Sequence, residues 1–189
     1  MESELKSPGR HRAAPAGMPP ALIRPFDLAY EGEVRDLLAA CFREIAPPSA
    51  QPEAEAYIAN ALAGDYRDIA AHYRPGRGRG FWLALSREGD LMGTFALLPS
   101  GEEAAELRRM YVGAGFRRCG VARAMLARAE ALCVGWGFRR LCLTTSSLNT
   151  AAIEFYRAAG FRQREHVPAG ARGKPPPGVR AFAFEKALP

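Results

Sequence analysis

Six residues decide how this sequence is interpreted: Arg117-Arg118-Cys119-Gly120-Val121-Ala122. They stand where an apolar segment ending at Val112 is followed by a segment with helical periodicity. The first backbone N–H groups of a helix have no partner inside it, and they lie at the positive end of the helix dipole. Gly120 permits a ligand to approach the backbone closely. The turn therefore predicts an anion-binding site, and a solvated basic helix start is the equally weighted alternative.

The positive charge of the chain is concentrated in the half that contains this turn. The net charge is +6, but residues 1–100 hold 11 Lys and Arg against 13 Asp and Glu, whereas residues 101–189 hold 15 against 7. Residues 101–140 alone contain 8 Arg and 4 Glu. A polyanion, a membrane surface or a phosphorylated cofactor is compatible with this distribution. Charge gathered at one helix start favours the phosphorylated cofactor, so we do not expect a nucleic-acid partner.

Length and composition exclude several classes of protein. A chain of 189 residues is close to a single domain of about 100–200 residues. With 48% hydrophobic and 24% charged residues, disorder throughout, collagen and coiled coil are excluded. No apolar run approaches the ~18 residues of a membrane helix, and the first twenty residues lack the apolar core of a signal peptide, so we expect a cytoplasmic protein with no membrane partner.

Metal and nucleotide motifs are also missing from the sequence. The four cysteines have no C-x-x-C spacing and the three histidines are too few for a His-rich site, so no metal is predicted. The signatures of α/β-hydrolases, P-loop NTPases and dinucleotide-binding oxidoreductases do not occur. These three enzyme classes are therefore disfavoured.

The apolar patterns predict the order of elements along the chain. Strands are expected at residues 22–24, 81–86, 91–98, 105–112, 141–145, 161–167 and 179–186. Helices are expected at residues 31–44, 53–73, about 120–136 and 150–159, with Gly64-Asp65 as a possible break in the second. The basic, glycine-rich run at residues 74–80 resembles RNA-binding tracts in composition, but its place between a helix and a strand favours a hairpin-like loop. This order predicts a single α/β domain at residues 21–189, with a mixed, mostly antiparallel sheet flanked by helices. Residues 1–20 are expected to be a disordered arm, and Met18 is an alternative start.

The motif at the turn resembles that of the GNAT superfamily of acyl-CoA-dependent N-acyltransferases. The pyrophosphate signature of that superfamily is [Gln/Arg]-x-x-Gly-x-[Gly/Ala], which here reads Arg117-x-x-Gly120-x-Ala122. Three further segments strengthen the resemblance, because they look like the family's fourth strand, helix entry and following segment: residues 106–112, 120–126 and 149–161. The resemblance extends from about Leu22 to Leu188, and its specific motifs lie within residues 106–161.

The resemblance implies a sheet splayed between its fourth and fifth strands, with acetyl-CoA as co-substrate in the slot. Backbone groups of Met110 and Val112 would pair with the pantetheine arm, although ordinary strand roles are the alternative. The pyrophosphate would rest on the amides of residues 118–122, with arginine side chains reaching the phosphates. The implied cofactor-binding residues are Met110, Tyr111, Val112, Arg117, Arg118, Cys119, Gly120, Val121, Ala122, Arg123, Asn149 and Tyr156. Asn149 is equally well explained as a helix N-cap.

Two residues are candidates for the chemistry. In the family the tyrosine matching Tyr156 commonly faces the thioester sulfur, and a phenol with a pKa near ~10 can protonate a departing thiolate. Phe155 would face the other way, into the core. Glu106 is the leading general base, with pairing to Arg108 or Arg109 as the equally weighted alternative. Two weaker candidates for the base are His72 and His166.

The implied function is transfer of the acetyl group of acetyl-CoA directly to a primary amine of a small molecule or peptide. The acceptor is expected between the first two helices, where Tyr57, Tyr66, His72 and Tyr73 occur, and the connection at residues 168–178. That connection is a plain loop or a lid, and as a lid its Arg172 and Lys174 would favour an acceptor with a carboxylate. The alternatives are a catalytically silent acyl-CoA-binding module and an acetyltransferase of a protein or ribosomal acceptor. A homodimer is compatible with the family.

Overall fold

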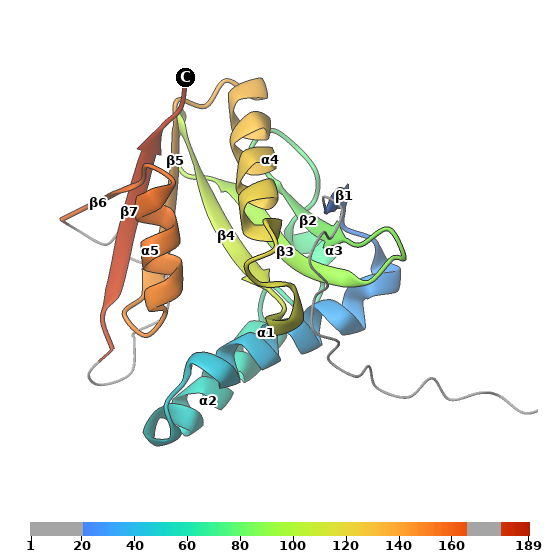
Figure 1. The fold of residues 1–189 in the computed structure, drawn as a ribbon. Coiled ribbons are helices and arrows are strands. Elements are labelled where there is room, and N and C mark those ends of the chain that lie inside the picture. Colours follow the sequence, from blue (N-terminus) through green and yellow to red (C-terminus); the bar gives the residue numbers. More distant parts are fainter. Residues whose placement is uncertain (1–20, 166–178) are drawn as a thin grey trace, which may run out of the picture.

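A computed structural model describes residues 21–165 and 179–189 as a seven-stranded sheet with helices on both faces (Figure 1). The strand order is β1-β2-β3-β4-β5-β7-β6. The strands are β1 (Leu22–Pro25), β2 (Gly80–Leu85), β3 (Leu91–Pro99), β4 (Ala104–Val112), β5 (Arg140–Ser146), β6 (Arg162–Gln163) and β7 (Ala181–Ala187). The helices are α1 (Glu31–Ile45), α2 (Gln51–Ala63), α3 (Ile69–His72), α4 (Val121–Gly135) and α5 (Thr150–Ala158). The arm predicted at residues 1–20 lies outside the described residues.

The sheet is antiparallel except where β4 and β5 run parallel, which confirms the predicted α/β fold class. Only residues 104–107 of β4 pair with residues 140–143 of β5. Beyond that point β4 remains paired with β3 and β5 with β7, and the two central strands separate (Figure 1). The separation leaves facing strand edges whose backbone groups do not bond to each other. This is the splay that the sequence resemblance implies.

Each face of the sheet has its own hydrophobic core. One core lies under α4 and α5 and contains Trp82, Phe95, Leu107, Met125 and Phe184. The other lies under α1, α2 and α3 and contains Leu38, Tyr66, Ile69, Tyr73 and Phe81. Strand residues alternate between the two faces, so the same strands supply both cores.

The helix expected at residues 53–73 is divided in two, and the break falls at Gly64-Asp65, where the sequence offers a possible break. Helix α2 ends at Ala63, where the N–H of Gly64 donates to the carbonyl oxygens of Asn60 and Ala61. A turn follows, and Asp68 starts the short α3 by accepting a hydrogen bond from the Ala71 N–H at 2.8 Å. The interruption brings Asp65 into the interior, where it pairs with a strand residue. A tertiary contact therefore overrides the helical pattern of this segment.

The basic run at residues 74–80 forms the hairpin-like turn that the sequence favours, with paired hydrogen bonds between Gly76 and Arg79. The Arg77 guanidinium lies 4.8 Å from the centre of the Phe138 ring, and its Nε donates to the Trp136 carbonyl at 3.0 Å. Arg79 donates to the His72 carbonyl at 3.0 Å. These arginines fasten the turn to neighbouring segments.

Two C-terminal elements differ from their expected bounds. β6 covers Arg162–Gln163, whereas a strand at residues 161–167 was expected, and residues 166 and 167 lie outside the described part. The last strand begins at Ala181 and ends at Ala187. Within the described residues no helix combines the length and the apolar character needed to cross a membrane.

Candidate functional site

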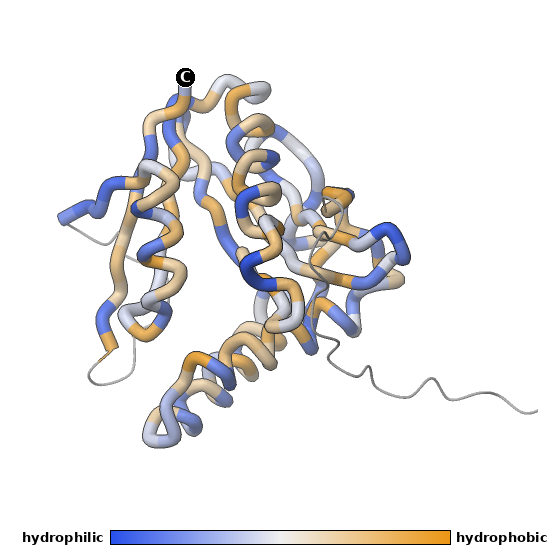
Figure 2. Tube along the Cα trace, viewed as in Figure 1, coloured by the Kyte–Doolittle hydropathy of each residue, from blue (hydrophilic) through white to orange (hydrophobic). Residues whose placement is uncertain are grey.

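A bulge in β4 shapes the sheet at the point where the strands separate. The register with β3 shifts between Thr94 and Ala96, and Arg109 has a positive φ of 52°. The Thr94 hydroxyl donates to the Arg109 carbonyl at 2.9 Å and supports this backbone conformation. The extra residue places Arg109 on the face covered by α1 and α2, while Met110 packs against the opposite core. Figure 2 shows that β4 becomes hydrophilic in this part.

Arg109 and Asp65 form a buried ion pair beneath α2. Arg109 Nε donates to Asp65 Oδ2 at 2.8 Å and Nη2 donates to Oδ1 at 2.5 Å, with side chains 9% and 8% exposed. Nη1 donates to the Tyr57 hydroxyl at 2.8 Å, and the guanidinium carbon lies 5.0 Å from the centre of the Tyr66 ring. The Tyr73 hydroxyl donates to Asp65 Oδ2. Each nitrogen of the Arg109 guanidinium and each carboxylate oxygen of Asp65 thus has a hydrogen-bond partner inside the protein.

This environment shifts the pKa of both acids in the network. Burial alone raises the pKa of Asp65, but hydrogen bonds and charge attraction from Arg109, with a hydrogen bond from Tyr73, lower it below its usual value. Burial and the Asp65 charge raise the pKa of Tyr73 above its usual value. Asp65 is therefore a carboxylate and Tyr73 a neutral phenol at neutral pH.

A pocket of about 490 Å³ opens beside this network. Its walls come from the end of α1, from α2, from β4 after the splay, from the end of β5 and from residues 179–181 before and at the start of β7. Arg108, Arg109 and Asp65 lie on its inner side. Of the residues expected to line an acceptor site, Tyr57 does so, whereas Tyr66 and Tyr73 are fully buried in the adjoining core and His72 is exposed. The segment at residues 168–178 and His166 lie outside the described residues.

Tyr156 stands on the opposite side of the splay, on α5. Its hydroxyl donates to Met110 Sδ at 3.6 Å, so it lies beside the strand that borders the opening. The side chain is 7% exposed, and its ring packs against Phe161 and Phe184 with centroids 5.5 and 6.5 Å apart. Phe155 packs against the same core, as expected, and Tyr156 is the more buried of the two. Packing of the ring holds the hydroxyl at the border of the splay.

Glu106 lies on β4 just before the strands separate, in register with Cys142. Its neighbours Ala105 and Leu107 belong to the core under α4 and α5, so Glu106 faces the side of α1 and α2. The lining of the pocket begins two residues further along the strand, at Arg108. In the structure Arg109 pairs with Asp65 and not with Glu106, which was one of the alternatives from the sequence.

The loop before α4 presents an uncapped helix start. Gly120 is the N-cap with a φ of 82°, no side chain caps the helix, and a Cβ at this position would meet nothing within 4 Å. Among the described residues, no backbone acceptor is bonded to the N–H groups of residues 118–123. Arg118 also has a positive φ, of 60°, and is exposed, as is Arg123. The hydrophilic colour at the lower end of α4 in Figure 2 marks this loop.

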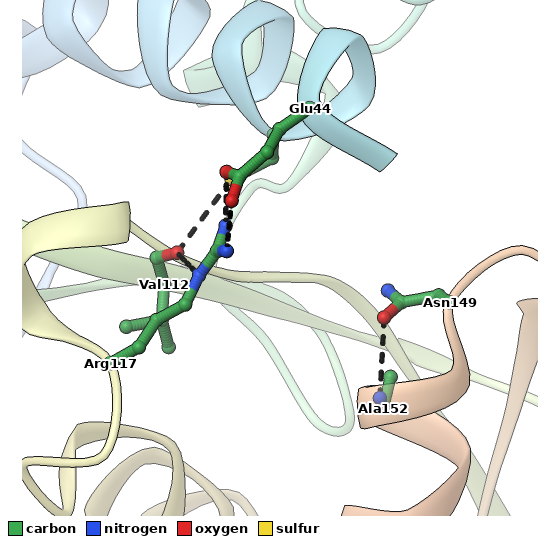
Figure 3. Close-up of polar contacts among 6 residues, drawn as sticks. Glu44, Val112, Arg117, Asn149 and Ala152 are labelled. Carbon is green, nitrogen blue, oxygen red and sulfur yellow. Dashed lines mark hydrogen bonds and ion pairs between the residues drawn. The ribbon is translucent and has the colours of Figure 1, made fainter. Parts of the chain in front are cut away.

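Arg117 has a structural contact of its own (Figure 3). Its Nη2 donates to Glu44 Oε2 at 2.7 Å and its Nε donates to the Val112 carbonyl at 3.3 Å. The Cys41 thiol donates to the same carbonyl at 3.8 Å, and burial raises the pKa of Cys41 although Arg117 lowers it. Arg117 therefore ties the end of α1 to the loop before α4, and the Val112 carbonyl already accepts bonds from within the chain.

The remaining cofactor candidates occupy the ends of α4 and α5. Asn149 is an N-cap, because its Oδ1 accepts a hydrogen bond from the Ala152 N–H at 3.2 Å (Figure 3). The Cys119 thiol donates to the Arg117 carbonyl at 3.2 Å. Val121, the first residue of α4, is buried, and Ala122 is partly exposed. No group of three or more His, Cys, Asp or Glu side chains suited to a metal ion occurs in the described part of the chain.

Sequence reasoning did not identify Asp65, Arg108 or Arg109 as a connected cluster. The Arg108-Arg109 pair in the middle of a mostly apolar strand was the available signal, because charged residues in mid-strand need partners. Nothing in the sequence near Asp65 indicates which residue it pairs with, since the two positions are 44 residues apart. The pocket and its charges are therefore findings of the tertiary structure.

Comparison with known proteins gives a consistent set of relatives. The model of the acetyltransferase (GNAT) family matches residues 32–161. N-acetyltransferase family 8 member 3 of Rattus norvegicus is 34% identical over 114 residues, which cover 58% of this chain and 50% of that protein. N-acetylaspartate synthetase of Danio rerio is 32% identical over 108 residues, covering 57% and 38%. This chain spans half or less of the length of these curated relatives.

Solved structures of the same fold are also similar. The crystal structure of PaiA N-acetyltransferase from Thermoplasma acidophilum in complex with coenzyme A superposes with a TM-score of 0.67. It is 17% identical, and the match covers 89% of this chain and 99% of that one. At this level of identity the likeness concerns the fold.

Proposed function

This chain belongs to the acetyltransferase (GNAT) family, and on that premise we propose that it transfers the acetyl group of acetyl-CoA directly to a primary amine. The observation that carries the proposal is the splay between β4 and β5, bordered by the Tyr156 hydroxyl on one side and by the pocket on the other. A co-substrate and an acceptor that enter from opposite sides can meet there without a covalent enzyme intermediate.

The described residues fit acetyl-CoA at two places. β4 beyond Leu107 has an edge that is not bonded to β5, so its backbone groups are available to an extended pantetheine arm in the manner of an added strand. The uncapped amides at the start of α4 suit a pyrophosphate, because they combine free N–H donors with the positive end of a helix dipole. The PaiA N-acetyltransferase, whose structure is a complex with coenzyme A, has the same fold, which supports this assignment.

The arginines near the phosphate site have different roles in the proposal. Arg118 and Arg123 are exposed beside the start of α4 and form no salt bridge within the described residues, so we assign phosphate contacts to them. Arg117 is bonded to Glu44 and to the Val112 carbonyl, so we assign it to holding the loop in place. Cys119, Val121 and Ala122 contribute backbone amides.

The proposed chemistry uses Tyr156 as general acid and Glu106 as general base. Acetyl-CoA supplies the acetyl group as a thioester. The Tyr156 hydroxyl, held at the border of the splay, donates its proton to the departing sulfur. Glu106 faces the side of α1 and α2, from which the acceptor enters, and it accepts the proton of the amine directly or through water. The Met110–Val112 backbone faces the reacting carbonyl in this proposal.

The acceptor in this proposal is a small molecule. The pocket of about 490 Å³ falls within the range of roughly 300–1,000 Å³ that is usual for small-ligand sites. The name N-acetylaspartate synthetase, borne by one relative, refers to a small acetylated amino acid and supports the same class. A cytoplasmic location and a homodimer remain part of the proposal.

Two measurements on the full chain test this function. Calorimetric titration with acetyl-CoA is expected to give saturable binding, and release of coenzyme A is expected when amino acids, polyamines, aminoglycosides or peptides are supplied as acceptors. No heat of binding at millimolar acetyl-CoA contradicts the proposal. Binding without transfer to any acceptor identifies the chain as a silent acyl-CoA-binding module instead.

A further inference from the structure

The pocket between α1, α2 and the separated strands carries an unequal set of charges. Three arginines line it, Arg108, Arg109 and Arg180, against two acids, Glu53 and Asp65. Arg109 and Asp65 neutralise each other through two hydrogen bonds and are buried together. The charges left to face a ligand are therefore those of Arg108, Arg180 and Glu53.

Arg108 is the arginine best placed to bind a ligand. It lies on β4 directly after the splay begins and is partly buried in the pocket wall. No salt bridge to its guanidinium forms within residues 21–165 and 179–189. A partly buried guanidinium loses hydration, and the group that best compensates it is a carboxylate or phosphate bound through two parallel hydrogen bonds.

Arg180 supplies a second positive charge from the opposite side. Its backbone N–H donates to Ser147 Oγ at 3.0 Å, which fixes the segment before β7. Its guanidinium carbon lies 5.5 Å from the centre of the Phe182 ring, and no carboxylate pairs with it in the described part of the chain. Because Arg180 is exposed, it attracts an anion to the mouth of the pocket more than it anchors one.

The neutral lining indicates the size of the ligand and adds a donor. Tyr57 stacks on Phe42 with centroids 4.1 Å apart, so its ring is fixed. Its hydroxyl oxygen accepts from Arg109, so the hydroxyl proton is directed away from that guanidinium and is available to another acceptor. Much of the remaining wall is alanine from α2 and from the connection between α1 and α2. A small ligand with an oxygen anion fits this wall.

Glu53 makes the pocket bipolar. It lies in the first turn of α2, and its Oε2 is buried without a hydrogen-bond partner among the described residues. An orphan carboxylate oxygen requires a donor, and an N–H group of the ligand supplies one. A ligand with both a carboxylate and N–H donors satisfies Arg108 and Glu53 together.

We propose that the acceptor is an amine of the amino-acid class whose carboxylate is bound by Arg108, with Arg180 attracting it to the pocket. This inference rests on the proposed function and names the class of substrate for the same site. Arg108 is here a specificity residue, which recognises the acceptor and takes no part in proton transfer.

Kinetics on matched acceptors test the inference. Each L-amino acid is compared with its own carboxamide, and spermidine is included as an amine without a carboxylate. A charge-assisted hydrogen bond pair predicts kcat/KM about ten- to a hundredfold higher for the amino acids than for the carboxamides. Arg108→Gln is expected to remove this preference by lowering kcat/KM for amino acids alone, and Arg108→Lys to restore part of it.

Controls separate recognition from folding and from the proposed function. Arg87→Gln, in the exposed turn between β2 and β3, is expected to leave both acceptor classes unchanged. Calorimetry with acetyl-CoA and a thermal melt on each variant report whether the cofactor site and the fold are intact. Equal or better transfer to carboxamides or spermidine overturns the inference alone. No transfer to any amine overturns the proposed function as well.

Discussion

The two faces of β4 differ in the kind of interior that they form. On the face covered by α4 and α5, Ala105 and Leu107 join an apolar core in which the Tyr156 ring is packed. On the face covered by α1 and α2, Arg109 is buried with Asp65 and bonded to Tyr57. The difference arises at one bulge, which turns an additional charged residue toward the second face.

The contrast separates two requirements of one site. Packing against Phe161 and Phe184 fixes the Tyr156 hydroxyl beside Met110. On the charged face the satisfied ion pair forms part of the pocket wall, and Glu53 Oε2 is buried there without a hydrogen-bond partner among the described residues. Under the proposed function, the apolar face serves the thioester and the charged face serves the acceptor.

The largest effect is expected from breaking the ion pair of the charged face. Asp65→Asn leaves the Arg109 charge buried without its counter-ion, which costs about 3–5 kcal/mol of the free energy of unfolding. Urea denaturation followed by circular dichroism measures the loss. Glu55→Gln breaks the exposed ion pair between Glu55 of α2 and Arg43 of α1, and it is expected to leave the free energy of unfolding unchanged. Equal stability of the two variants would contradict the role assigned to the pair.

The same pair predicts a pH dependence. Because the folded-state pKa of Asp65 is lowered, its contribution to stability is complete above its unfolded pKa of about 3.9 and is lost as pH falls through the folded pKa. The stability difference between the wild type and Asp65→Asn should therefore be constant at neutral pH and shrink below about pH 4. Denaturation curves at a series of pH values measure it, and a difference that grows in acid would refute this sign.

The next effect is expected on the apolar face. Tyr156→Phe keeps the ring contacts and removes only the hydroxyl, so kcat should fall by about 10²–10⁴-fold if the phenol is the general acid. Binding of acetyl-CoA by calorimetry and the melting temperature should remain close to those of the wild type. An unchanged kcat with a working acceptor removes Tyr156 from the chemistry.

Glu106→Gln, tested in parallel, should lower kcat and change the pH dependence of kcat, because the proposed general base is then absent.

A smaller effect is expected where α4 begins. Gly120→Ala adds a Cβ at a positive φ, in the open space assigned to the pyrophosphate, and should weaken acetyl-CoA binding about tenfold, or about 1.4 kcal/mol. Gly137→Ala is the matched control, because Gly137 has a φ of 79° and equally open surroundings beyond the other end of α4. Both variants carry the same backbone strain. Equal acetyl-CoA affinity in the two would show that the start of α4 is not the phosphate site.

The smallest effect is expected from the cap of α5. Asn149→Ala removes the bond to the Ala152 N–H and should cost about 1 kcal/mol of stability. Asn149→Ser retains a capping oxygen and should keep the stability while losing the amide group. A thermal melt and an acetyl-CoA titration separate the two roles. Weaker acetyl-CoA binding by Asn149→Ser at unchanged stability reports a contact between the Asn149 amide and the cofactor.

The sequence predicted the elements whose signals are local. The strands around residues 81–112 and the helix from Glu31 have strong apolar periods and clear turn residues, and the structure has them within one or two residues. The possible break at Gly64-Asp65 was readable from the glycine, but the burial of Asp65 against Arg109 was not. Periodicity does not reveal a partner 44 residues away.

The candidate site divides in the same way. The signature from Arg117 to Ala122 and the position of Tyr156 were readable because they occupy fixed spacings on adjacent elements. That Arg117 is paired with Glu44 was not readable, because the contact joins the end of α1 to a loop 73 residues later. The resemblance left open which of Arg117, Arg118 and Arg123 reach the phosphates, and the structure gives Arg117 a partner at the end of α1.

The sequence alone determined the family, the order of strands and helices and the turn suited to an anion, since each depends on residues close together along the chain. Only the tertiary structure decided where the pocket proposed for the acceptor lies and which charges face it. Those features depend on a bulge in β4, on the burial of Asp65 and on the neutralisation of Arg109. Ion pairs between distant segments form when packing brings them together, and no local pattern encodes which charge will remain unpaired.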